Sequence, residues 1–240
     1  MPDFSEVPLS IDQEPVQDQV EEDLGAVAEA VTEKAKPVKL PAPTRQPMPT
    51  GVIKAADLLD QEYVILDLGP YRKYFGSVSN NFDAMFHGQP GAGKTFFLLP
   101  FANWLAENIG NTIYISSEEL GSVTLQNTIK KTIGKPSEHL YFAKDLKGVD
   151  LNDYKAVFMD SVNHVGLDIN SYKALREKYP DQIFILILQK TKSGQFKGGK
   201  DWEHEIDIAG EFRFEKESGH RILDITSKNR FGTLGEYVMN

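Results

Sequence analysis

The stretch of sequence that best indicates the fold is Gly88-Gln89-Pro90-Gly91-Ala92-Gly93-Lys94-Thr95. It matches the pattern Gly, any four residues, then Gly-Lys-Ser or Gly-Lys-Thr, which forms a phosphate-binding loop. Gly88, Gly91 and Gly93 permit positive φ angles and let backbone amides approach phosphate oxygens without a Cβ in the way. We therefore predict that all eight residues bind the phosphates of a nucleotide.

The last two residues of this loop carry its chemistry. Lys94 places a positive charge on the β- and γ-phosphates of ATP, and the Thr95 hydroxyl is a ligand for Mg²⁺. The flanking sequence supplies the setting that the pattern requires, because residues 82–87 are predicted to form a short buried strand and 96–109 a helix. ATP and Mg²⁺ are therefore the predicted cofactors.

Charge and proline content divide the chain into two parts. Residues 1–50 hold eight of the thirteen prolines and a net charge of −6, which leaves −3 for the rest. We predict a disordered, acidic, proline-rich tail over 1–50 and one folded domain over 51–240. Within the tail, four apolar residues share one helical face, namely Val20, Leu24, Val27 and Val31. This segment is either a transient helix without a role or a helix that docks on a protein partner.

Composition also excludes several classes of function. The near-neutral domain has no overall basic surface, so any contact with nucleic acid must use local loops. The absence of cysteine excludes disulfides, thiol chemistry and cysteine-ligated zinc, and it fits a reducing, cytoplasmic compartment. No apolar run is long enough to span a membrane, so no membrane partner is predicted.

Strands and helices are predicted to alternate along the domain. Short strands that are apolar on both faces indicate a parallel sheet covered on both sides. The strands are predicted at 111–115, 140–142, 156–159 and 183–188, and helices at 120–133 and 171–179. Residues 208–215 and 221–228 alternate in polarity around Glu217-Ser218-Gly219, which indicates an antiparallel hairpin. The predicted fold class is a three-layer α/β domain with a mainly parallel central sheet and a C-terminal antiparallel hairpin.

Three polar residues follow predicted strands and are candidates for the chemistry of hydrolysis. Asp160 ends the strand at 156–159 and would hold Mg²⁺, the alternative being a residue that caps a turn. Glu118 follows the strand next along the chain from the loop and is the candidate general base, although a helix N-terminus would also favour a carboxylate there. Gln189 would sense the γ-phosphate or, alternatively, cap its strand.

These pieces, in this order, resemble the RecA/RadA branch of phosphate-loop ATPases over about residues 80–237. Four further motifs carry the resemblance: Ser116-Ser117-Glu118-Glu119-Leu120, Asp160-Ser161, Thr191-Lys192-Ser193-Gly194 leading to Trp202-Glu203-His204-Glu205-Ile206-Asp207, and Lys228-Asn229-Arg230-Phe231-Gly232. The last, Lys-Asn-Arg-Phe-Gly, is the most specific for RadA. The chain lacks the zinc finger and the protease-like domain of full-length bacterial RadA, and in this it is similar to compact recombinases of phages and mobile elements.

The resemblance implies a RecA-like fold and a site shared between copies of the chain. ATP would lie at the joint between protomers of a ring or filament, where one protomer contributes Lys94, Thr95, Glu118 and Asp160. The neighbouring protomer would contribute Lys228 and Arg230, which act on the developing negative charge. The alternative for these two cations is a solvated pair at a strand end.

The resemblance also implies a loop that binds single-stranded DNA. This loop would run from Lys192 to Lys200. Its lysines Lys192, Lys197 and Lys200 would contact DNA phosphates, and the Phe196 ring would stack on bases. The alternative is a flexible surface loop. A first DNA loop, at residues 162–169, would be short.

The function implied is that of an oligomeric, Mg²⁺-dependent ATPase acting on single-stranded DNA in recombination or repair. Two alternatives remain open. One is a replicative helicase motor, and the other is a nucleotide-switched scaffold that binds ATP, hydrolyses it slowly and recruits proteins through its tail.

Overall fold

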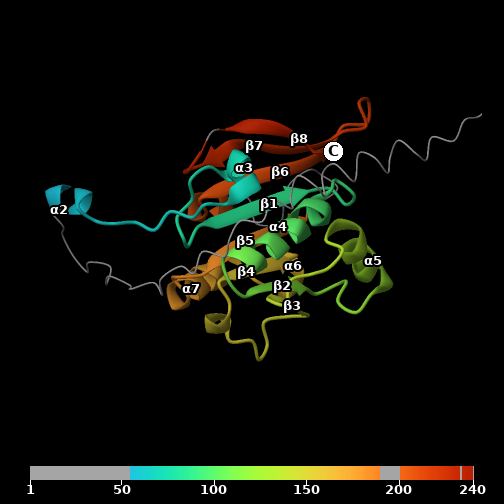
Figure 1. Ribbon diagram of the computed structural model, residues 1–240, viewed down its shortest axis with the longest axis horizontal. Coiled ribbons are helices and arrows are strands. Elements are labelled where there is room, and N and C mark those ends of the chain that lie inside the picture. The colour runs from blue at the N-terminus through green and yellow to red at the C-terminus, as the bar shows by residue number, and fades with distance from the viewer. Residues whose placement is uncertain (1–54, 190–200, 233, 240) are drawn as a thin grey trace, which may run out of the picture. The chain divides into compact units, whose positions relative to one another are not determined.

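The computed structural model describes residues 55–189, 201–232 and 234–239. Within them, one eight-stranded sheet has the strand order β3-β2-β4-β5-β1-β6-β7-β8 (Figure 1). Its strands are β1 (Asp83–Gly88), β2 (Thr112–Ser116), β3 (Leu140–Ala143), β4 (Ala156–Asp160), β5 (Ile183–Gln189), β6 (Ile208–Phe214), β7 (Arg221–Asn229) and β8 (Gly235–Met239).

The sheet is parallel from β3 to β6 and antiparallel from there to β8. Strands β1 and β2 are buried at every position, as parallel strands covered on both faces must be. The predicted hairpin is confirmed as β6 and β7. Strand β8 extends it and was not predicted from the sequence.

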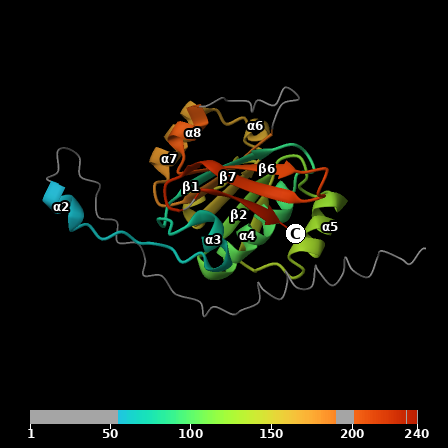
Figure 2. The same cartoon turned by 90° about the horizontal axis from the view of Figure 1, so that it is seen from above.

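Helices cover both faces of the sheet (Figure 2). One face carries α3 (Arg72–Phe75), α4 (Lys94–Asn108) and α5 (Val123–Thr132), and the other carries α6 (Val162–Val165), α7 (Ile169–Lys178) and α8 (Asp201–Glu205). Consecutive residues of a strand point to opposite faces, so Phe158 packs in the core under α4 while Val157 packs in the core under α7. The predicted three-layer α/β fold is confirmed.

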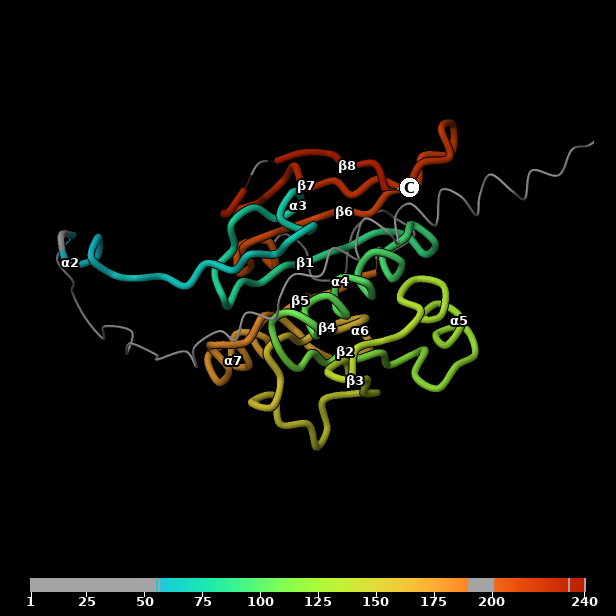
Figure 3. The backbone as a smooth tube through the Cα atoms, viewed as in Figure 1, coloured from blue at the N-terminus to red at the C-terminus, as the bar shows by residue number. Residues whose placement is uncertain are grey.

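Side-chain caps fix where two of the predicted helices begin. Ser122 accepts a hydrogen bond from the amide of Leu125 at 3.0 Å and starts α5. Asp168 does the same for α7 through the amide of Ser171 at 2.7 Å. Helix α4 continues through Pro100, and Figure 3 follows the chain from β1 into this helix.

The structure adds short elements that were not predicted. They are α2 (Ala55–Leu59), α3, α6, α8 and two 3₁₀ turns, η1 (Gly69–Tyr71) and η2 (Leu151–Asp153). Residues 162–169, expected to be a plain loop, contain α6. None of the helices described here has the length and hydrophobicity that a bilayer span requires.

Candidate nucleotide site

The phosphate loop joins the carboxyl end of β1 to the first turn of α4. Gly91 and Gly93 have φ angles of 80° and 96°, a region open to glycine because it has no Cβ. Lys94 folds back over the loop, and its Nζ donates to the carbonyls of Gly88 at 2.7 Å and Gln89 at 3.0 Å. The loop therefore has the backbone geometry and the cation of an anion-binding cradle at a helix N-terminus.

The pairing of the strands places the other predicted residues at the same edge of the sheet. Gly88 pairs with Gln189, and Asp160 pairs with Ser116. The carboxyl ends of parallel strands are where ligands of open α/β sheets bind. Burial lowers the pKa of Lys94, and the charge of the nearby Asp160 carboxylate counteracts this shift.

Asp160 is held by a tyrosine that sequence reasoning did not identify. The buried Tyr114 hydroxyl donates to Asp160 Oδ2 at 2.8 Å. Burial raises the pKa of Asp160, while the Tyr114 hydrogen bond and the Lys94 charge lower it. The residue left a signal in the sequence, since a tyrosine inside a buried strand needs a partner for its hydroxyl.

The residues present fit a Mg²⁺ ion. Thr95, in the first turn of α4, supplies a hydroxyl oxygen and Asp160 a carboxylate, and Mg²⁺ prefers such hard oxygen ligands together with nucleotide phosphates. A bound cation would also offset the cost of burying the Asp160 charge.

Glu118 lies between two polar side chains from neighbouring strand ends. Its Oε2 accepts from Gln189 Nε2 at 3.0 Å, and its Oε1 lies 3.1 Å from His164 Nε2. The other ring nitrogen of His164 lies 2.7 Å from the Ser161 hydroxyl. Gln189 thus contacts the predicted base directly, and His164 is a further residue that sequence reasoning did not assign to the site.

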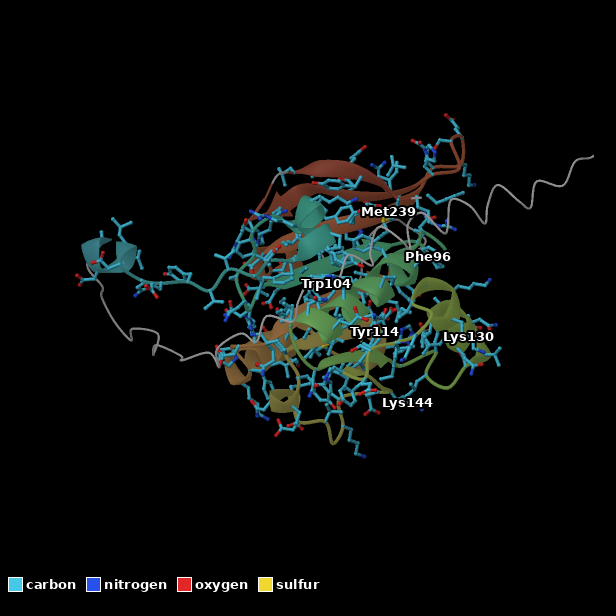
Figure 4. All side chains as sticks on the ribbon, in the orientation of Figure 1. Phe96, Trp104, Tyr114, Lys130, Lys144 and Met239 are labelled. Carbon is cyan, nitrogen blue, oxygen red and sulfur yellow. The ribbon has the colours of Figure 1, made fainter. Side chains whose placement is uncertain are left out.

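A cavity of about 210 Å³ opens beside the loop. Its lining joins the loop to α5 and to the start of β7, through Gly91, Gly93, Lys94, Thr95, Phe96, Thr128 and Arg221. Phe96 lies at the N-terminal end of α4 (Figure 4), and the Arg221 guanidinium is 5.9 Å from the centre of its ring. A larger depression, of about 490 Å³ around Gly148 and Tyr179, lies away from the phosphate loop and offers no such cradle.

The two cations of the RadA-type signature lie away from the loop of their own chain. Lys228 of β7 pairs with Ala209 of β6, which pairs with Met85 of β1. Met85 precedes the end of β1 by three residues, so Lys228 lies about 10 Å below the loop end of the sheet and two strands away from β1. Its Nζ donates to the carbonyls of Glu203 and His204 at the end of α8. Arg230 pairs with Asp207 at 3.1 Å.

The predicted DNA contacts and the predicted tail lie outside the described residues. The four DNA candidates belong to the segment 190–200, namely Lys192, Phe196, Lys197 and Lys200. The apolar helical face at residues 20–31 belongs to the segment 1–54, as does the domain boundary at residue 51. These assignments stay predictions.

Comparison with known proteins gives relatives in sequence but no matching family model. The chain is 30% identical to the DNA repair protein RadA of Halalkalibacterium halodurans over 62% of its own length and 36% of that protein. It is 26% identical to the DNA repair protein RadA of Bacillus subtilis over 77% of its length and 44% of that protein. The chain thus spans less than half the length of these curated relatives.

The architecture has a solved counterpart. The flagellar accessory protein FlaH of Methanocaldococcus jannaschii superposes with a TM-score of 0.55 at 14% sequence identity, over 74% of this chain and 94% of that one. At this identity the likeness concerns the fold alone. Motifs, strand order and sequence matches agree: this chain has a RecA-like phosphate-loop fold and is similar to RadA in sequence.

Proposed function

We propose that the chain is a Mg²⁺-dependent ATPase of the RecA/RadA type. One observation carries the proposal: Lys94 and Thr95 of the loop share one edge of the sheet with Asp160 and Glu118. A phosphate loop alone binds nucleotide, whereas hydrolysis also needs a carboxylate for the metal and a group that activates water. This arrangement supplies all of these groups.

The geometry supports a role for each of these residues. The loop amides and Lys94 bind the β- and γ-phosphates, and Thr95 with Asp160 would hold Mg²⁺, which neutralises charge on the phosphates when bound. Glu118 accepts a proton from the attacking water. Gln189 donates to Glu118 and holds the carboxylate on the side of β5.

We further propose that the active form is an oligomer on single-stranded DNA, in recombination or repair. Lys228 and Arg230 support a shared site, since both lie below the loop end of the sheet and two strands from β1, which suits contact with another copy's loop rather than with their own. The lysine-rich segment 190–200 directly follows Gln189 and is suited to phosphate contacts. The RadA matches carry the assignment to DNA repair.

Steady-state ATP hydrolysis tests the chemistry. Glu118→Gln is expected to lower kcat by at least 100-fold, an order of magnitude typical for loss of a general base, while ATP binding persists. Lys94→Ala is expected to lose binding itself. Activity unchanged in Glu118→Gln would overturn the assignment of the base.

Single-stranded DNA tests the wider role. The native chain is expected to hydrolyse ATP faster with single-stranded DNA and to shift its mobility in a gel. ATP binding with negligible turnover would favour the scaffold alternative, and unwinding coupled to hydrolysis would favour the helicase motor. Removal of residues 1–50 is expected to leave hydrolysis intact, and loss of folding would contradict the predicted boundary.

A further inference from the structure

We infer that His164 is the positioning residue for the base Glu118, through a hydrogen-bonded chain of four side chains; the inference rests on the proposed ATPase. The chain runs Ser161, His164, Glu118, Gln189, with separations of 2.7, 3.1 and 3.0 Å between consecutive partners. It connects the carboxyl ends of β4, β2 and β5 at the edge of the sheet that carries the phosphate loop.

The chemistry of the groups fixes the direction of the two bonds to Glu118, and the tautomer of His164 sets the direction of the third. A carboxylate only accepts, so His164 Nε2 and Gln189 Nε2 both donate to Glu118. In a neutral imidazole whose Nε2 carries the proton, Nδ1 accepts, and the Ser161 hydroxyl donates to it. One arrangement of protons therefore satisfies all three contacts.

The backbone that carries His164 is more buried and better hydrogen-bonded than the turn that carries Glu118. Ser161 and Val162 are buried, and the amides of His164 and Val165 donate to the Ser161 carbonyl at 2.9 and 3.1 Å. Glu118 instead lies in a turn, with 51% of its side chain exposed. The carboxylate is thus oriented from outside its own segment.

This orientation leaves room for catalysis. An ionised carboxylate has about four lone-pair positions, and two hydrogen bonds leave others free to accept from water. A general base that is itself held by a third group is a recurring arrangement in enzymes, because a freely rotating carboxylate seldom points at the water. His164 would thus act on turnover rather than on ATP binding.

The test compares His164→Leu, which removes the donor, with His164→Gln, whose amide can restore it. We expect His164→Leu to lower kcat about tenfold with KM for ATP and thermal unfolding unchanged, a loss typical of an orienting partner. His164→Gln is expected to recover most of the rate. In a Glu118→Gln background, His164→Leu is expected to have no further effect, because the two residues act as a unit.

His139→Leu is the matched control. This histidine is also exposed and bonds one side chain, Asn111 at 3.0 Å, but it precedes β3 at the opposite end of the sheet. Its replacement is expected to leave kcat unchanged. If His164→Leu does not fold, His164→Asn, whose amide is too short to reach Glu118, takes its place.

Three results overturn the inference. They are an unchanged kcat in His164→Leu, an equal loss of rate with and without Glu118, and a loss that His164→Gln does not repair. A native chain that hydrolyses no ATP would instead remove the proposed function, so the two failures can be told apart.

Discussion

Arg221 lies beside the phosphate loop, a position that the sequence did not indicate. The RadA-type signature suggested Lys228 and Arg230 as the cations of the site. The arginine that the fold brings to the cavity beside its own phosphate loop is Arg221. A Cβ on Gly93 would lie 2.7 Å from Arg221 Cδ, so the two residues are in close contact. Arg221 and the half-exposed Phe96 ring therefore flank the cavity into which a nucleotide would extend from the loop.

We predict that Arg221→Ala weakens ATP binding about tenfold, through loss of a cation that can contact phosphate or stack on a base. Equilibrium titration with a fluorescent ATP analogue measures the change. Arg72→Ala is the charge-matched control, since this exposed arginine starts α3, bonds Ser77 and does not line the cavity beside the loop. Equal affinities of the native chain and Arg221→Ala would contradict the prediction.

At the scale of elements, the signature segment 228–232 ties β7 to the turn after α3. The Asn229 side chain donates to the carbonyl of Phe75 at 3.3 Å and accepts from the amide of Phe231 at 2.9 Å. The Ser77 amide donates to the Phe231 carbonyl at 3.2 Å. This structural role stands beside the proposed catalytic one, and it explains why Gly76 approaches the segment so closely.

We predict that Gly76→Ala destabilises the fold by more than about 3 kcal/mol, measured by denaturant unfolding. Gly76 has φ 82°, and a Cβ there would lie 2.2 Å from the Phe231 carbonyl oxygen. Gly134→Ala is the control for a positive φ alone, because its φ is 73° and its Cβ would meet nothing within 4 Å, whereas Gly76 also has ψ −152°, a region open essentially to glycine only. The control isolates the cost of a positive φ, about 1 kcal/mol. Equal losses in the two variants would show that the contact adds nothing.

Elements with a strong local pattern were predictable, and those that depend on distant contacts were not. The strand at 183–188 is uniformly apolar and agrees with β5 to within one residue. Strand β8 is exposed at alternate positions and forms only by pairing with β7. In the site, Lys94 and Asp160 follow from motifs, whereas the contact between Tyr114 and Asp160 joins residues 46 positions apart and needs the fold.

At the scale of the whole molecule, a buried carboxylate near the amino ends of the strands links three elements. Asp83 of β1 accepts from Tyr172 of α7 at 2.6 Å and pairs with Arg176 at 2.9 Å, and its amide donates to Asp207 at 3.1 Å, just before β6. Burial raises the pKa of Asp83 to about 6, although the Arg176 charge lowers it. The folded state therefore binds this proton more tightly than the unfolded chain does.

We predict that Asp83 makes the fold less stable as pH rises. Its contribution is fully present below its unfolded pKa, near 4, and is lost as pH passes about 6, with a total on the order of 3 kcal/mol. Urea unfolding of the native chain and of Asp83→Asn, at roughly pH 3.5 and roughly pH 7.5, on either side of this window, measures the difference. A native-minus-variant stability that rises with pH would show that Arg176 outweighs burial.

The site that we propose to be shared between copies of the chain can be tested only in the assembled protein. Glu118→Gln removes the base that each chain supplies to its own loop, and Arg230→Gln removes the cation that we propose each chain supplies to its neighbour. Each variant alone is expected to be nearly inactive. In a mixture, some joints combine an intact loop side from one variant with an intact Arg230 from the other, so partial ATPase activity is expected to return.

A mixture of Glu118→Gln with Lys94→Ala is the control, because both lesions lie on the same side of the joint and every joint remains defective. Because Arg230 also pairs with Asp207, thermal unfolding of Arg230→Gln must first show an intact fold. If the folded Arg230→Gln chain keeps full activity, Arg230 takes no part in hydrolysis. If the mixture is no more active than its components, Arg230 serves its own chain. Either result shows that the site is not shared through Arg230.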